Sequence, residues 1–151
     1  MQILITDRNL SRRDHRVMDF LRRQAIDNEG ASNAKLAAAV VLKNKIISTG
    51  RNQLKSHPFA AEYGKNSDAI YLHAEANAIV NSLNHVSKHD LSKATLYVYR
   101  VKRPRSHRQY ETEWTSGISK PCNGCMRAIV EFGFKRVVYT TDNDDEFAVL
   151  Q

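Results

Sequence analysis

The 151-residue sequence lacks the features that mark secreted and membrane proteins. No apolar run approaches the about 18 residues that cross a membrane, and the N-terminal MQILITDRNLSRRD becomes charged too early for a secretory signal. The only two cysteines are too close in sequence to cross-link a secreted scaffold. We therefore expect a soluble, cytoplasmic protein with no membrane partner, in which Cys122 and Cys125 are reduced and have a chemical role.

Acidic residues are also in the minority. The chain has 23 Lys and Arg residues against 16 Asp and Glu residues, a formal net charge of +7 and a pI near 9.6. This excess favours anionic partners such as phosphates or nucleic acid, without deciding between them. The length and the 42% hydrophobic content fit a single domain over residues 1–151, since a chain of this size buries roughly two-thirds of its unfolded surface.

Hydrophobic periodicity predicts alternating helices and strands. Helical patterns cover about 11–28, a segment that begins at His73, and 121–132. Strand patterns cover 36–42, 46–47, 94–101 and 134–141. The first two strands should form a hairpin, and the last two should be parallel because a helix connects them. The chain therefore predicts an α/β fold, with a mixed β-sheet flanked by helices.

Three segments lack a lasting period. We expect residues 51–69 to form a polar loop and the basic segment 102–120 to be an excursion on the surface. Connections longer than about 12–15 residues are often functional. The acidic segment 142–147 gives no clear prediction, and we expect no further strand after the one that ends at residue 141.

The two cysteines lie three residues apart at the start of a predicted helix. Both sulfurs should project from one face of the first turn, where the helix dipole lowers the pKa of thiols. Catalytic zinc sites use three protein ligands, drawn from Cys, His and carboxylates, and keep the fourth position for water. His73, at the start of the other predicted helix, is the candidate third ligand.

Glu75 follows His73 by two residues. A carboxylate beside a zinc ion that activates water can take a proton from the water and return it to a substrate nitrogen. A CxxC pair alone also fits a redox dithiol or a structural zinc site. A redox pair leaves His73 and Glu75 unexplained, and a structural site needs a fourth ligand, which none of the other five histidines supplies at a typical spacing.

His73-Ala74-Glu75 and Pro121-Cys122-Asn123-Gly124-Cys125 together fit the H-x-E…P-C-x-x-C signature of zinc-dependent nucleobase deaminases. The chain resembles the cytidine and deoxycytidylate deaminase superfamily. The segment HAEANAI, together with the asparagine in STGRN, is most similar to the corresponding segments of the deoxycytidylate (dCMP) deaminases. The resemblance implies a three-layer cytidine-deaminase-like fold with a core at about 35–141, a basic insertion at about 102–120, and a zinc site at the N-termini of two helices.

The resemblance also implies residue roles. Glu75 matches the proton shuttle, and His73, Cys122 and Cys125 match the Zn²⁺ ligands. Three further positions match substrate-binding residues: Asn52 through its side chain, Ala74 through its backbone, and Lys120 through its main-chain carbonyl. A polar residue that merely ends a strand is the alternative for Asn52.

The implied function is that of a hydrolase acting on a C–N bond, which converts dCMP to dUMP and ammonia as part of a homo-oligomer. A deaminase of tRNA adenosine or of cytosine in single-stranded nucleic acid would use the same zinc core, with Tyr110 or Trp114 stacking a base. A non-catalytic, zinc-stabilised binding module is a second alternative, against which an intact Glu75 argues. A 5′-phosphate requires cations, and the candidates are Arg51, Lys55, Arg100, Lys102, Arg103, Arg105 and Arg108.

Overall fold

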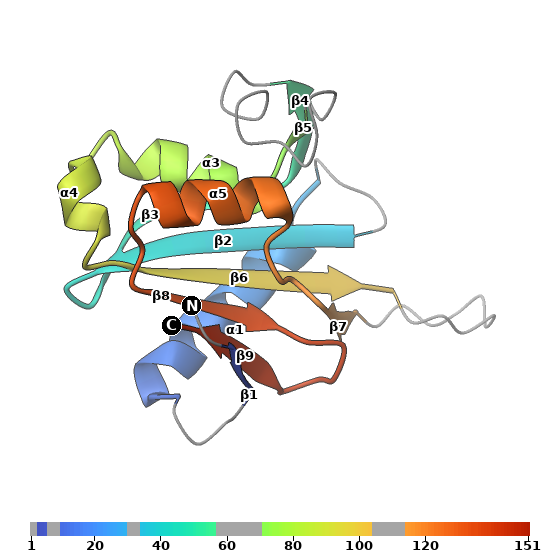
Figure 1. The fold of residues 1–151 in the computed structure, drawn as a ribbon. Helices are drawn as coiled ribbons and strands as arrows, with labels where there is room; N and C mark the ends of the chain where they lie inside the picture. Colours follow the sequence, from blue (N-terminus) through green and yellow to red (C-terminus); the bar gives the residue numbers. More distant parts are fainter. Residues whose placement is uncertain (1–2, 6–9, 30–33, 57–70, 104–113) are drawn as a thin grey trace.

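The computed structural model describes residues 3–5, 10–29, 34–56, 71–103 and 114–151 (Figure 1). The helices are α1 (Arg12–Ile26), α3 (Ala74–Ser82), α4 (Lys88–Leu91) and α5 (Asn123–Glu131). The strands are β1 (Ile3–Ile5), β2 (Ala34–Leu42), β3 (Lys45–Arg51), β4 (Gln53–Ser56), β5 (Tyr71–Leu72), β6 (Thr95–Lys102), β7 (Thr115–Gly117), β8 (Arg136–Thr140) and β9 (Phe147–Leu150). Among these described elements, no helix is both long and apolar enough to cross a membrane.

The main sheet is mixed. Its order is β1-β9-β8-β6-β2-β3, and β7 pairs with β6. β6 and β8 are parallel, as expected for strands joined through a helix, whereas the other pairs are antiparallel. β4 and β5 form a separate two-stranded ladder.

Helices cover both faces of the sheet, which gives three layers (Figure 1). Successive residues of a strand face opposite sides, so the apolar β2 supplies both layers. Ala38 and Val40 pack in the cluster that contains α3 and α5, while Ala37 and Ala39 pack in the cluster that contains α1. The predicted α/β class, a mixed sheet flanked by helices, is confirmed.

Local sequence explains where the helices begin and end. Ser11 caps α1 in a capping box: its hydroxyl accepts from the Asp14 N–H, and the Asp14 carboxylate accepts from the Ser11 N–H. After α5, Gly133 has a φ of +75°, the left-handed conformation that glycine adopts at helix C-termini. α5 begins at Asn123 rather than at Pro121, because Cys122 is the N-cap in an extended conformation.

Two expectations were wrong. A further strand, β9, does follow β8, and it pairs with both β8 and β1. The connecting turn includes Asp145 at a φ of +61°, which reverses the chain and returns four apolar residues to the sheet. The basic segment is not only a surface excursion, since β7 pairs with β6 and Ser116 and Ser119 are buried.

Other parts of the predicted loops also pair or fall outside the described residues. Residues 51–69 do not form one loop, because β3 extends to Arg51 and β4 follows it. Residues 57–70 and 104–113, which cover much of both polar segments, lie outside the described part of the chain.

α3 lies very close to β3 at Gly50. A Cβ added to Gly50 would lie 2.3 Å from the backbone nitrogen of Ala78 and 2.6 Å from the carbonyl oxygen of Ala74. Real Cβ atoms essentially never approach other atoms this closely, so the absence of a side chain at Gly50 sets the distance between the sheet and the first turns of α3.

Candidate metal centre and active site

The N-termini of two helices bring three soft ligands together. His73 is the N-cap of α3, Cys122 is the N-cap of α5, and Cys125 lies in the first turn of α5. Both N-cap residues have extended backbones, and neither side chain caps its own helix. These side chains are therefore available to meet in the space between the two helix ends.

The separations of the three ligand atoms suit one metal ion. His73 Nδ1 lies 3.6 Å from Cys122 Sγ and 3.5 Å from Cys125 Sγ, and the three ligand atoms lie within 4.8 Å of one another. Zn–S and Zn–N bonds of about 2.3 and 2.0 Å, at a tetrahedral angle, place sulfur and nitrogen about 3.5 Å apart. The His and Cys donors therefore fit zinc in both chemistry and spacing.

The thiols are free and interact with each other. The hydrogen bond from Cys125, aided by His73, lowers the pKa of Cys122 well below that of an ordinary thiol. The same hydrogen bond, together with burial, raises the pKa of Cys125. The lowered pKa of Cys122 favours its thiolate, the form of cysteine that binds metals.

Glu75 lies on the first turn of α3 beside this group. The residue is only 4% exposed, and its Oε1 has no hydrogen-bond partner among the described residues. Burial raises the pKa of the carboxyl above its ordinary value. A buried carboxylate oxygen without a partner is costly unless a ligand or water meets it, so Glu75 marks a place where a polar group binds.

A cavity of about 330 Å³ opens onto these residues. Six of the seven predicted site residues line it: Asn52, His73, Ala74, Glu75, Lys120 and Cys122. The seventh, Cys125, is buried and belongs to the same metal-binding group. Residues far apart in the sequence therefore converge on one space large enough for a small organic molecule.

Asn52 has a structural role in addition to lining the cavity. Its Oδ1 accepts hydrogen bonds from Asn28 Nδ2 at 2.8 Å and from the Leu36 N–H at 2.9 Å. Its Nδ2 donates to the Ala34 carbonyl at 3.0 Å. An amide nitrogen has two hydrogens, so one N–H of Asn52 has no partner among the described residues and is available to a ligand.

The chain before the cysteine motif is fixed by Ser119. Its N–H donates to the Thr140 carbonyl at 3.0 Å, and its hydroxyl bonds to the Val98 carbonyl at 2.9 Å. These contacts hold the next residue, Lys120, at the edge of the cavity. Ser119 and Ile118 also line the cavity and carry no signal in the sequence that identifies them.

The structure shows which of the candidate phosphate-binding cations line the cavity and which interact with other residues. Arg100 lines the cavity; its Nη1 donates to the Ile118 carbonyl at 3.2 Å, and its buried Nε lacks a partner within the described ranges. Arg51 is hydrogen-bonded to Gln24, and Lys102 is paired with Asp142 at 3.0 Å. Arg103 lies over the Trp114 ring. The side chains of the other three, Lys55, Arg105 and Arg108, are outside the described part of the chain.

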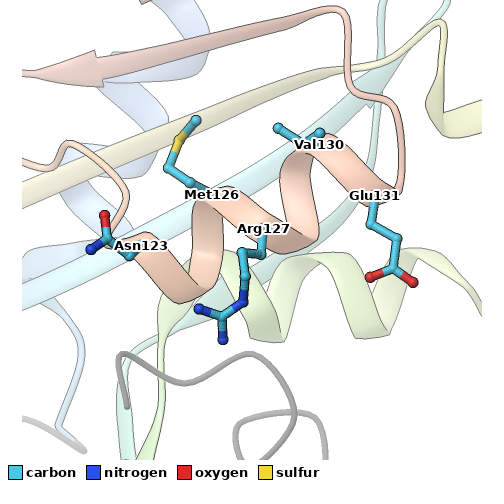
Figure 2. Close-up of a pocket in the computed structure, with 5 residues that line it drawn as sticks. All are labelled: Asn123, Met126, Arg127, Val130 and Glu131. Carbon is cyan, nitrogen blue, oxygen red and sulfur yellow. The ribbon is translucent and has the colours of Figure 1, made fainter.

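A second pocket, of about 530 Å³, lies on the outer face of α5 (Figure 2). Met126 and Val130 point to one side of the helix, and Arg127 and Glu131 point to the other. The pocket contains none of the metal-binding side chains and no carboxylate–histidine pair. We therefore place the chemistry in the cavity at the helix N-termini.

Comparisons with known proteins identify the family and the fold. A family model described as the cytidine and deoxycytidylate deaminase zinc-binding region matches residues 11–141. The fold is similar to that of cytidine deaminase from Burkholderia pseudomallei, with 18% identity, a TM-score of 0.60, and coverage of 94% of this chain and 93% of that one. A dCMP deaminase from the cyanophage S-TIM5 is 20% identical, with a TM-score of 0.46 and 82% of both chains covered. No curated protein sequence matches the chain.

Proposed function

Because the chain belongs to the cytidine and deoxycytidylate deaminase family, a family defined by its zinc-binding region, we propose that it hydrolyses the amino group of dCMP to give dUMP and ammonia. The observation that supports this most strongly is the meeting of His73, Cys122 and Cys125 next to Glu75, a buried carboxylate whose Oε1 has no partner among the described residues. Neither a redox dithiol nor a structural zinc site requires such a carboxylate.

His73, Cys122 and Cys125 would hold the zinc ion. When bound, the ion supplies Lewis-acid polarisation that makes water a nucleophile at neutral pH. Glu75 would remove a proton from the water that attacks C4 of the cytosine ring and deliver it to N3. It would then pass the second proton to the departing amino group, so that ammonia leaves and a carbonyl forms at C4.

The rest of the cavity would orient the nucleotide. The backbone of Ala74, at the start of α3, would hydrogen-bond the pyrimidine edge, and the Lys120 carbonyl would accept from the leaving amino group. The remaining N–H of Asn52 would bind the sugar or the base. Ala74 lies at the start of α3, Asn52 is held by Leu36 and Ala34, and Lys120 follows the fixed Ser119, so these groups need little reorganisation during the reaction.

Arg100 supports a nucleotide over a nucleoside. It lines the cavity, and part of its guanidinium is buried without a partner among the residues described. A guanidinium is suited to binding phosphate through paired N–H groups. We therefore propose that Arg100 binds the 5′-phosphate of dCMP.

The test is ammonia release by zinc-loaded protein from dCMP, CMP, deoxycytidine, cytidine, a tRNA and a single-stranded oligonucleotide. We expect dCMP to be the best substrate by kcat/KM. Exclusive turnover of the tRNA or the oligonucleotide would replace dCMP by a polynucleotide substrate. Absence of turnover with every substrate, in protein shown to contain zinc, would favour the non-catalytic binding module.

Arg100→Gln tests the phosphate contact separately. We expect KM for dCMP to rise about 10-fold to 100-fold, as for loss of a hydrogen bond to a charged group, while deoxycytidine turnover stays unchanged. Arg16→Gln, on the exposed face of α1, is the matched control. An equal loss of activity with both substrates would contradict a role of Arg100 in phosphate binding.

The proposed homo-oligomer can be tested by light scattering on the purified protein.

A further inference from the structure

A third pocket, lined mainly by polar residues, lies at the opposite end of the main sheet from the metal centre. It has a volume of about 210 Å³ and is formed by the start of α1, the β2–β3 turn, and the starts of β6 and β8. In Figure 1 these segments lie on the left, whereas α3 and α5 have their N-termini at their right-hand ends. The two cavities share no lining residue.

One side of this hollow is a neutral ion pair. Arg136 donates from Nη1 and Nη2 to the two oxygens of Asp14, each at 2.9 Å. Asp14 also accepts hydrogen bonds from the Tyr97 hydroxyl and from the Ser11 N–H. The only carboxylate that lines the hollow is therefore fully occupied, and its charge is balanced by Arg136.

Four more cations surround the ion pair. Arg13, Lys43, Lys93 and Lys135 all line the hollow and are exposed. None of these four side chains forms an ion pair or hydrogen bond with any residue in the described ranges. Because like charges around one small space repel each other, an anion bound there would be attracted by all four. We refer to these four residues and the Asp14–Arg136 pair as the basic hollow.

The hairpin turn holds one of the cations in place. Leu42 pairs with Lys45, so Lys43 and Asn44 form a two-residue turn, and their φ values are +50° and +68°. Such turns favour asparagine and glycine, and a lysine in this left-handed conformation is less favourable. The turn therefore places Lys43 at the edge of the hollow, at some cost in stability.

We propose that the basic hollow binds a compact oligophosphate, such as the di- or triphosphate group of a small molecule. Four cations from separate segments match the charge of several linked phosphate groups better than the charge of one phosphate group. A polynucleotide site would instead need cations spaced along a groove, together with exposed aromatic rings. The only aromatic residue that lines the hollow, Tyr97, is 3% exposed, and its hydroxyl is bonded to Asp14.

Titration calorimetry of the full chain with inorganic triphosphate tests the proposal. We expect one site per chain and affinities that increase from phosphate to pyrophosphate to triphosphate. The double variant Lys43→Asn/Lys135→Gln should bind about 100-fold more weakly, since each lost charge-assisted contact is worth about tenfold. Asparagine suits the backbone of the turn, so the variant should keep its melting temperature.

Two single variants complete the test. Lys45→Gln removes an exposed lysine from the same hairpin outside the hollow, and Arg100→Gln alters the other cavity; both should bind triphosphate as the wild type does. Equal binding by the double variant and the wild type would overturn the proposal, as would no binding by the wild type. Tighter binding of a single-stranded oligonucleotide, lost in the double variant, would also overturn it. None of these measurements depends on turnover, so they stand apart from the proposed deaminase activity.

Discussion

The substitution Gly50→Ala should distort the geometry of the metal centre without replacing any predicted site residue. The added Cβ would lie 2.3 Å from the Ala78 nitrogen, whereas ordinary contacts begin at 3.4 Å. Relief of this overlap requires a movement of about 1 Å between β3 and α3. His73 and Glu75 lie at the start of α3, so they move with it.

The expected effects are large on function and moderate on stability. Overpacking of this kind costs about 1–3 kcal/mol of folding free energy. A displacement of about 1 Å at a catalytic group costs about 100-fold in rate. We therefore expect kcat for dCMP, measured by ammonia release, to fall about 100-fold. Zinc affinity, measured by competition with a chromogenic chelator, should also decrease. Urea denaturation measures the loss of stability.

Gly133→Ala is the matched control. Gly133 has a φ of +75°, and the nearest atom to an added Cβ is 3.6 Å away, so alanine there introduces backbone strain without a clash. It should destabilise the protein by about 1 kcal/mol and leave kcat unchanged. The account of Gly50 would be refuted if Gly50→Ala retained wild-type kcat and zinc affinity, or if Gly133→Ala lost as much of both.

Two further outcomes concern the ion pair and the metal ligands. Burial opposes ionisation of Asp14, but hydrogen bonds from Arg136, Tyr97 and Ser11 prevail and lower its pKa from 3.8 to about 2. The resulting stabilisation of about 2 kcal/mol is present in full above pH 4 and is lost as the pH falls towards 2. The difference in free energy of unfolding between the wild type and Asp14→Asn, measured with urea, should therefore shrink over that range. Cys122→Ser should weaken zinc binding by more than about 100-fold, since loss of a residue that only supports a ligand already costs about 10–100-fold. Metal analysis after dialysis measures this loss. Retention of wild-type zinc content would contradict the assignment of Cys122 as a ligand.

Local signals in the sequence predicted the elements that depend on local interactions. The capping pattern at Ser11 and the apolar spacing after it predicted α1, and the run after Gly133 predicted β8. β7 and β9 were missed for a different reason. Each is three or four residues long, and it becomes a strand only through pairing with β6 or β8, contacts that no short window contains.

The site shows the same division. His73, Glu75 and the two cysteines form a motif that the sequence displays directly, and the fold brings the three ligands together. The choice of Arg100 among seven cations depends on which side chains line the cavity. Likewise, the contacts of Asn52 with Asn28 and Leu36 join distant segments, so its structural role could not be separated from a ligand-binding role beforehand.

The most direct test of the central claim is ammonia release from dCMP by zinc-loaded wild type and by Glu75→Gln, with the zinc content of both measured on the same samples. If the buried carboxylate beside the three ligands transfers the protons, the variant should contain as much zinc as the wild type and have no detectable turnover. Wild-type turnover by Glu75→Gln, or turnover by protein freed of metal, would contradict the account.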